Sequence, residues 1–305
     1  MIVTNILVLY GGNSTERAVS ISSAMRVIEA FADTAHRVIA CDYRGAEPSA
    51  PLLRLARESD AVFLALHGGD GEGGVLQSAL EQAGIFHYTG SDARGASLAL
   101  DKASAKQCVS EVGVPSAQGA VWQPGAPPPA FPLPVIVKPV FGGSSVGLKK
   151  IQCQSELAAC TVSEPLLVEE FLSGREFTVG VLEDTALPAV EIIPRGGIYD
   201  YKHKYTAGAT KEICPAAIDK EKAALLSDLA IRAFRALGLR DFARIDFKEN
   251  DRGTPCFLEA NTLPGLTQTS LLPLAASAAG ISFPALIERM AQAAAKRKNN
   301  ISEAP

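Results

Sequence analysis

The amino-acid sequence predicts an α/β fold made of more than one packed unit. Its 305 residues are about twice the length of a typical single domain, which favours two or three units. The first 115 residues alternate short apolar runs with helix-like segments, a pattern typical of a parallel sheet covered by helices. After residue 135 the apolar runs follow one another across tight turns, which predicts an antiparallel sheet (α+β character) in the centre of the chain.

The expected elements of residues 1–115 can be placed by their apolar runs. The expected strands cover residues 6–10, 37–41 and 61–66. The expected helices cover residues 19–31, 75–83 and 93–112. The last of these helices should end at Gly113, because Pro115 follows as a stop.

A proline-rich segment separates this region from the next. Residues 122–134 hold six prolines in thirteen positions and can form neither a helix nor a central strand. We therefore expect a domain boundary near this segment, although a surface loop within one larger domain is an alternative. Beyond it we expect strands at 135–138, 148–151 and 166–170, a long helix over 219–237, a hairpin, and two apolar helices up to about residue 295.

The composition excludes several classes of protein. Apolar residues make up 47% of the chain and charged residues 20%, so a substantial core can form. Acidic residues outnumber basic ones by 33 to 29, and we expect no nucleic-acid partner because no positive surplus is present. The six cysteines form no CxxC pair, so neither a disulfide framework nor a zinc site is expected.

No membrane insertion is expected. The most apolar C-terminal stretch is interrupted by Pro273, Gly280 and Pro284, whereas a membrane span needs about 20 apolar residues without such breaks. The N-terminus enters an apolar run with no basic region before it, which favours a core strand over a signal peptide. We therefore expect a cytoplasmic protein.

Two small-residue loops follow parallel strands. GGNSTER (residues 11–17) and HGGDGEGG (67–74) each lie between an expected strand and a helix. Ligands gather at this edge of a parallel sheet. A nicotinamide-binding site is disfavoured because GxGxxG is absent. Glu16 could also serve only to complement the dipole of its helix.

A third loop, VKPVFGGSSVG (residues 137–147), lies between two strand-like runs. Its amides and hydroxyls could fold over phosphates, with Lys138 as a candidate phosphate ligand. The order GxxxxGK[ST] is absent, which disfavours a Walker-A site. A flexible loop without a ligand is the alternative.

The strongest geometric signal is a hairpin around the turn sequence ENDRGTP. If its two strands pair about a centre between residues 252 and 253, Asp246 lies opposite Glu259 and Arg244 lies opposite Asn261. Side chains two apart in a strand share a face, so all four should project together. Two carboxylates and an amide oxygen are hard ligands suited to Mg²⁺. A solvated salt-bridge ladder is the alternative, and the apolar residues flanking these positions argue against it.

Taken in order, these motifs resemble the D-alanine–D-alanine ligases of the ATP-grasp superfamily. The resemblance runs from residue 6 to about residue 274. It is carried by GGNSTER (11–17), HGGDGEGG (67–74), LDK (100–102), VIVKP with GGSSVG (135–147), LVEEFLSGREFTV (167–179), YDYKHKYTAGATKEICPA (199–216), ARIDF (243–247) and LEANTLPGLT (258–267). One departure is Gly73, where the family usually has an acidic residue.

The resemblance implies an ATP-grasp fold of three parts. These are an N-terminal parallel α/β domain (1–115), a central antiparallel domain (116–200) and a C-terminal α/β domain (201–305). ATP would lie between two sheets, and a loop over 200–215 would close over it and exclude water. The family also implies a homodimer.

Each site residue is carried over by its match to a family motif. Nucleotide binding is implied for Lys102, Lys138, Ser145, Glu169, Glu170, Leu172, Glu176 and Lys204. Among these, Glu169 and Glu176 match residues at the adenine and ribose, and Lys204 matches a γ-phosphate contact. Two Mg²⁺ ions, for which Mn²⁺ can substitute, are implied at Asp246, Glu259 and Asn261.

The remaining matches concern the amino-acid substrates. Glu16, Ser144 and Tyr205 match a hydrogen-bonded trio that holds the first D-alanine and a mobile loop. Arg244 and the Gly265 amide match an oxyanion site. Contacts to D-alanine are implied for His67, Ser270 and Leu271.

The implied reaction joins two D-alanine molecules with ATP, through an acyl phosphate, to give D-alanyl-D-alanine for peptidoglycan. Two alternatives stay open. One is a related ligase that takes D-lactate or D-serine second, and the other is a nucleotide-binding regulator without chemistry. Arg244, Lys204 and the three metal candidates together argue against the regulator, which would need no oxyanion donor.

Overall fold

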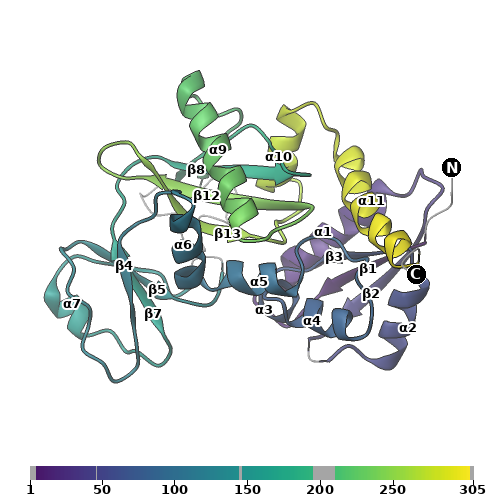
Figure 1. The fold of residues 1–305 in the computed structure, drawn as a ribbon, viewed down its shortest axis with the longest axis horizontal. Coiled ribbons are helices and arrows are strands. Elements are labelled where there is room, and N and C mark those ends of the chain that lie inside the picture. The colour runs from purple at the N-terminus through teal and green to yellow at the C-terminus, as the bar shows by residue number, and fades with distance from the viewer. Residues whose placement is uncertain (1–4, 46, 144–145, 195–209, 303–305) are drawn as a thin grey trace.

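The computed structural model describes residues 5–45, 47–143, 146–194 and 210–302, and it contains three β-sheets (Figure 1). An N-terminal parallel sheet lies at one end of the molecule and a small antiparallel sheet lies at the other. A larger antiparallel sheet lies between them, next to both. The α/β class with an antiparallel centre is therefore confirmed.

The N-terminal sheet has the strand order β2-β1-β3, and all its described pairings are parallel. Its strands are β1 (Asn5–Gly11), β2 (Arg37–Tyr43) and β3 (Ala61–Ala65). Residues of β1 and β3 are almost all buried, as expected for strands covered on both faces. Helix α1 (Arg17–Ala30) packs on β1, and the last helix of the chain, α11 (Phe283–Ser302), returns to pack on β3 and α1.

One expected helix is wrong in its extent. The segment expected as a single helix over 93–112 is divided at Asp101, which has extended backbone angles (φ −77°, ψ 95°). The Asp101 carboxylate accepts hydrogen bonds from the amides of Ala103 and Ser104 and so caps a second helix. The helices of this stretch are α2 (Ala50–Glu58), α3 (Gly69–Glu72), α4 (Val75–Gln82), α5 (Ala93–Leu100) and α6 (Lys102–Glu111).

The small antiparallel sheet has the order β4-β7-β5-β6 and carries its own apolar core around Trp122 and Val168. Its strands are β4 (Gly119–Trp122), β5 (Val135–Pro139), β6 (Lys149–Ile151) and β7 (Leu166–Glu170), and helix α7 (Gln154–Ala158) lies beside β6. The expected antiparallel pairing in this segment is confirmed.

The large sheet has the order β11-β10-β8-β12-β13, and β9 pairs with β8. Its strands are β8 (Glu176–Leu182), β9 (Thr185–Ala186), β10 (Val190–Pro194), β11 (Thr210–Ile213), β12 (Phe242–Glu249) and β13 (Pro255–Asn261). Helices α9 (Lys220–Ala236) and α10 (Leu271–Ala278) pack on β8. A domain boundary is expected between residues 200 and 201. Strands β8 to β10 come before that position in the chain and β11 to β13 come after it, yet all belong to this one sheet. The boundary therefore stays a prediction.

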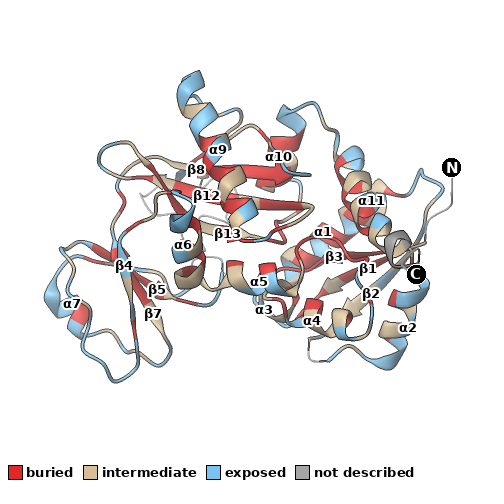
Figure 2. Ribbon diagram, viewed as in Figure 1, coloured by how far each residue is buried: buried red, intermediate tan, exposed pale blue. Residues whose placement is uncertain are grey.

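Burial follows these layers. Figure 2 shows buried residues concentrated in the strands of the N-terminal and large sheets, while the helices carry exposed outer faces. Within the described part of the chain, no single helix has the length and apolar character that a membrane crossing needs. The two C-terminal helices meet that test only as a pair, bent by 107° at their break.

Candidate active site

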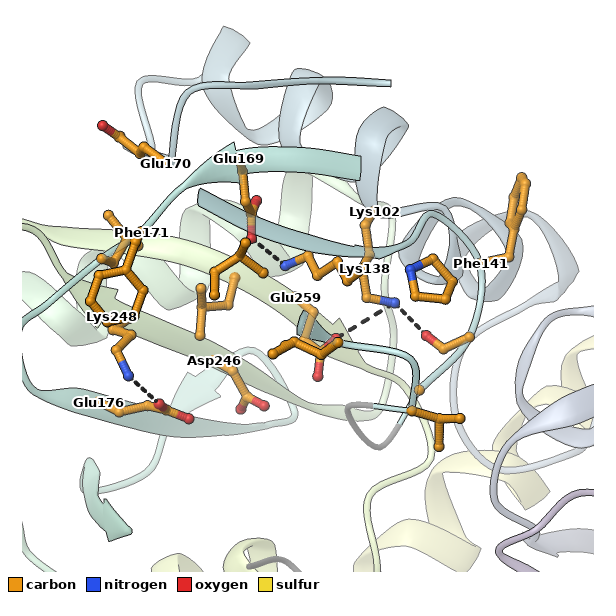
Figure 3. Close-up of a pocket in the computed structure, with 18 residues that line it drawn as sticks. Lys102, Lys138, Phe141, Glu169, Glu170, Phe171, Glu176, Asp246, Lys248 and Glu259 are labelled. Carbon is orange, nitrogen blue, oxygen red and sulfur yellow. Dashed lines mark hydrogen bonds and ion pairs between the residues drawn. The ribbon is translucent and has the colours of Figure 1, made fainter. Parts of the chain in front are cut away.

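Two adjoining pockets lie where the three sheets approach one another. The first lies between the small and large sheets (Figure 3), and the second extends toward the N-terminal sheet. Four residues line both pockets, namely Lys102, Gly142, Gly143 and Glu259. A group at the shared boundary can therefore act on ligands in both pockets.

The first pocket has apolar walls and charged ends. Its apolar side chains include Ile136, Leu172 and Leu258. Its charged side chains are Lys102, Lys138, Glu169, Glu170, Glu176, Asp246, Lys248 and Glu259. This combination suits a ligand with a flat apolar part and a highly charged part.

At one end, Glu169 lies between two lysines. Lys138 Nζ is 2.5 Å from Glu169 Oε1, and Lys106 Nζ is 2.5 Å from Glu169 Oε2. The three side chains are only 4–9% exposed. Lys106 is not among the residues predicted for the site, although its position four residues after Lys102 within one helix was an available signal.

A second charged pair lies along the pocket floor. Lys248 on β12 is directly opposite Glu176 on β8, and Lys248 Nζ donates to Glu176 Oε2 over 2.9 Å (Figure 3). Lys248 was also missed from the sequence. Its position two residues after Asp246, on the same face of β12, was the signal available.

The hairpin register predicted for the candidate metal face is confirmed. Asp246 pairs with Glu259, and Arg244 pairs with Asn261. Asp246 Oδ1 accepts from the Thr178 hydroxyl at 2.6 Å, and the two carboxylate oxygens accept from Arg244 Nε and Nη2 at 2.9 and 2.8 Å.

The residues at this face fit a Mg²⁺ ion. They supply two carboxylates and an amide, which are the oxygen donors that Mg²⁺ prefers. The amide oxygen of Asn261 is buried and has no hydrogen-bond partner among the residues that the structure describes, so it is an acceptor suited to a donor or a cation. No group of three or more His, Cys, Asp and Glu side chains is placed to hold a metal anywhere in the described ranges. A metal here would therefore depend on Asn261 and on oxygens supplied by the ligand.

The second pocket brings together residues that lie far apart in the sequence. The predicted site residues that line it are Glu16, His67, Lys102, Arg244, Glu259, Asn261, Gly265, Ser270 and Leu271. Glu16 stands at the start of α1, yet its side chain makes no capping hydrogen bond to the helix. Its place in the pocket wall thus favours a ligand-facing role over helix capping alone.

The turn containing Gly265 is shaped by a close approach to Ser270. A side chain at Gly265 would place its Cβ 2.7 Å from Ser270 Oγ, which is too close for any other residue without a shift. Ser270 Oγ in turn accepts from the Thr267 amide at 2.9 Å. Glycine at position 265 therefore leaves its backbone open to the pocket.

His67 connects the N-terminal sheet to this turn. Its Nδ1 lies 2.8 Å from the Leu263 carbonyl oxygen, which can only accept, so Nδ1 carries the proton. Its Nε2 then accepts from the Ser23 hydroxyl at 3.0 Å, and Ser23 Oγ accepts from the Leu266 amide at 3.1 Å. Burial lowers the pKa of His67, which favours this neutral form. Both ring nitrogens are thus engaged within the protein, and His67 positions the turn.

Glu72 is one of four acidic residues that line this pocket, together with Glu16, Glu212 and Glu259. Burial, followed by the nearby charge of Glu16, raises the pKa of Glu72 to about 7. The Gly68 amide donates to Glu72 Oε2 at 2.9 Å and opposes this shift. The next residue, Gly73, leaves room for Leu100, because a Cβ at position 73 would lie 2.6 Å from Leu100 Cδ2.

We expect Glu72→Gln to flatten the pH dependence of stability in the metal-free protein. The folded chain holds a proton on Glu72 up to a pH of about 7, whereas the ordinary pKa is 4.5. The folded state therefore binds more protons between these values, and the free energy of unfolding falls as pH rises through them. The variant should gain stability over wild type at pH 8 and match it near pH 4.5, measured by urea unfolding in a chelator. If the free energy of unfolding changed with pH in the same way for both proteins, the prediction would be wrong. Glu221→Gln, at an exposed position, serves as control.

Four predicted site residues lie outside the described residues. They are Ser144, Ser145, Lys204 and Tyr205. The described predicted residues all line one or both pockets.

The chain is similar in sequence to known proteins over most of its length. Residues 128–292 match the family model described as D-ala D-ala ligase C-terminus. The chain is 42% identical over 299 residues to a D-alanine–D-alanine ligase of Oleidesulfovibrio alaskensis, covering 93% of this chain and 94% of that protein. It is 40% identical over 302 residues to one of Syntrophotalea carbinolica, covering 96% and 97%.

Solved structures give the same result. The D-alanine–D-alanine ligase of Bacillus anthracis complexed with ATP superposes with a TM-score of 0.83 at 27% identity, covering 99% of this chain and 100% of that one. The VanG D-Ala:D-Ser ligase of Enterococcus faecalis superposes with a TM-score of 0.82 at 27% identity, covering 96% and 99%.

Proposed function

The chain belongs to the D-alanine–D-alanine ligase family, and from this premise we propose that its first pocket holds ATP and its second pocket holds two D-alanine molecules. The protein is an ATP-using ligase with the ATP-grasp fold, and it makes D-alanyl-D-alanine for peptidoglycan synthesis. The observation that best supports the pocket assignment is their shared boundary at Lys102 and Glu259.

The charges of the first pocket orient the nucleotide. Glu169 matches the family residue at the adenine, so we place the base at that end, against Ile136 and Leu172. The triphosphate then lies toward Lys102 and the Asp246 and Glu259 face. Nucleotide contacts are completed by Lys138, Ser145, Glu170, Glu176 and Lys204.

Asp246, Glu259 and Asn261 would hold two Mg²⁺ ions, or Mn²⁺ in their place. Bound there, the ions neutralise charge on the phosphates during transfer. The protein contributes the fixed direction of these oxygens, because the hairpin register and the Thr178 hydrogen bond hold Asp246 in place.

The reaction proceeds in two steps at the shared boundary. A carboxylate oxygen of the first D-alanine attacks the γ-phosphorus of ATP, ADP leaves, and an acyl phosphate forms. The amine of the second D-alanine, after losing a proton, attacks the acyl carbon, and phosphate leaves as the amide bond forms. Arg244 and the Gly265 amide stabilise the oxyanion that exists after the amine attacks and before phosphate leaves.

The second pocket recognises amino acids by charge. Glu16 attracts an ammonium group, and Ser270 with Leu271 receives the second D-alanine at the start of α10. His67 keeps the Gly265 turn in place beneath them. Glu16 is also expected to join Ser144 and Tyr205 in closing the pocket over the first substrate.

The test is phosphate release from ATP and Mg²⁺ with and without D-alanine, with the product identified by mass. We expect release to depend on D-alanine and the product to be the dipeptide. D-alanine-independent binding of ATP without turnover would instead support a regulator. We also infer a cytoplasmic homodimer with domain boundaries near residues 115 and 200, on family membership alone.

We expect Tyr205→Phe to shift the choice of second substrate. Family members that make D-alanyl-D-lactate have phenylalanine at the matching position, and the phenol is expected to bond through Ser144 to Glu16. D-alanine must lose a proton before attack whereas D-lactate carries no ammonium group, so the variant should form ester increasingly below about pH 7. Product masses with both acceptors at equal concentration, across a pH series, measure the shift. An unchanged product ratio would remove Tyr205 from this role.

A further inference from the structure

Lys106 lies behind the wall of the nucleotide pocket. It sits on α6, one turn after Lys102, and its side chain is 8% exposed. Its ammonium group is 2.5 Å from Glu169 Oε2, while Lys138 holds the other oxygen at the same distance. Glu169 and Lys138 line the pocket, and Lys106 does not. Among the described residues, Lys106 therefore reaches the pocket wall through its ion pair with Glu169.

Lys138 and Lys106 differ in the partners that their ammonium groups can bind once a nucleotide is present. Lys138 faces the pocket, so the phosphates compete with Glu169 for its ammonium group. Lys106 does not line the pocket, so it can stay on Glu169. If Lys106 were absent and Lys138 turned to the phosphates, Glu169 would be a buried carboxylate without a counter-ion, which is costly.

The electrostatic balance supports an ionised Glu169. Burial raises the pKa of Glu169, but the charges of Lys138 and Lys106, and their hydrogen bonds to the carboxylate, outweigh burial and hold the pKa below its ordinary value. Burial lowers the pKa of Lys106, and Glu169 opposes that shift. An ionised carboxylate can only accept hydrogen bonds, so it suits an exocyclic amino group on a base.

We propose that Lys106 is a positioning residue that holds Glu169 ionised and in place, so that Glu169 can accept a hydrogen bond from the 6-amino group of adenine. This inference rests on the proposed placement of ATP in the first pocket. Lys106 thereby sets the preference for adenine without touching the nucleotide.

The test compares ATP with purine riboside triphosphate, which lacks only the 6-amino group. A hydrogen bond to a charged acceptor corresponds to roughly 10- to 100-fold in affinity, and wild type should prefer ATP by that factor. Lys106→Met should lose about tenfold or more of this preference through a higher KM for ATP, with kcat within about twofold of wild type. The dissociation constants of both nucleotides, measured by calorimetry, should change in the same ratio.

Lys222→Met is the matched control. Lys222 Nζ lies 2.5 Å from Glu249, which is also buried, and this pair lies outside both pockets. The control should keep the full preference for ATP. If Lys106→Met weakened the binding of ATP and of purine riboside triphosphate by the same factor, Lys106 would have only a structural role. That result would overturn the proposal.

A double variant tests whether Lys106 acts through Glu169. Glu169→Gln alone should lower the preference, and adding Lys106→Met should lower it no further. Additive losses would overturn the proposal. If Lys106→Met does not fold, Lys106→Gln enters the same cycle. Because calorimetry needs no turnover, absence of D-alanine-dependent phosphate release would count against the proposed function while the nucleotide comparison still decides the role of Lys106.

Discussion

Glu259→Gln is expected to abolish D-alanine-dependent phosphate release. Glu259 lines both pockets and pairs directly with Asp246, so it lies at the boundary where we propose that phosphoryl transfer takes place. The substitution keeps the shape of the side chain and removes its charge. A loss of several kcal/mol in charge stabilisation at a metal and phosphate site corresponds to about a thousandfold or more in rate.

The fold should survive this change. Glu259 is on β13, whose pairing with β12 depends on backbone hydrogen bonds and on buried residues such as Phe247 and Phe257. The melting temperature without ligands should therefore stay close to that of wild type. The stabilisation of the protein by ATP with Mg²⁺ should be lost, because it depends on binding to the native state.

Glu221→Gln is a suitable control, since Glu221 is exposed in the first turn of α9. It changes the net charge by the same amount far from the site. A Glu259→Gln protein that is folded and turns over at the wild-type rate in saturating Mg²⁺ would refute the metal assignment.

Arg244→Ala is expected to lower kcat by roughly 10²- to 10³-fold, the usual cost of one oxyanion donor. Arg244 lines the second pocket, proposed to hold D-alanine, and its side chain is only 11% exposed. Its Nε and Nη2 atoms are bonded to Asp246, which fixes the plane of the guanidinium group. The KM for ATP should change much less than kcat.

Arg244→Lys separates charge from geometry. It keeps a positive charge beside Asp246 but loses the planar fork that holds two oxygens at once. If preorganisation matters, this variant should recover only part of the lost kcat. A rise in the KM for ATP with an unchanged kcat in either variant would instead make Arg244 a phosphate-binding group.

The candidate metal face could be predicted from sequence because a hairpin relates its residues by simple counting. Asp246 with Glu259 and Arg244 with Asn261 pair as the turn predicts. Closer to the turn the register shifts by one, since Phe247 pairs with Phe257 and Leu258 is left as the extra residue of a bulge. The strand pairs next to the turn therefore differ by one residue from the predicted pairs. The extra residue of the bulge compensates for this difference, so the pairs at the candidate metal face are those predicted.

Other features depended on contacts that a local pattern does not contain. The break at Asp101 lies within a continuous helix-like pattern, and only the capping bonds of its side chain mark it. The pairing of β8 with β12 joins segments about sixty residues apart, so the composition of either segment could not reveal it. The partners of Lys106 and Lys248 are Glu169 and Glu176, which lie far from them in the sequence, and this is why both lysines were missed.

The return of α11 to the N-terminal sheet has a consequence for biosynthesis. Strand β3 leaves the ribosome early, but the helix that covers it is made more than two hundred residues later. At a synthesis rate of about 5–20 residues per second, the apolar surface of β3 waits roughly ten seconds or longer for its cover. During that interval the nascent chain presents a sheet surface that other chains or chaperones can bind. The first region to be made is thus among the last to be completed.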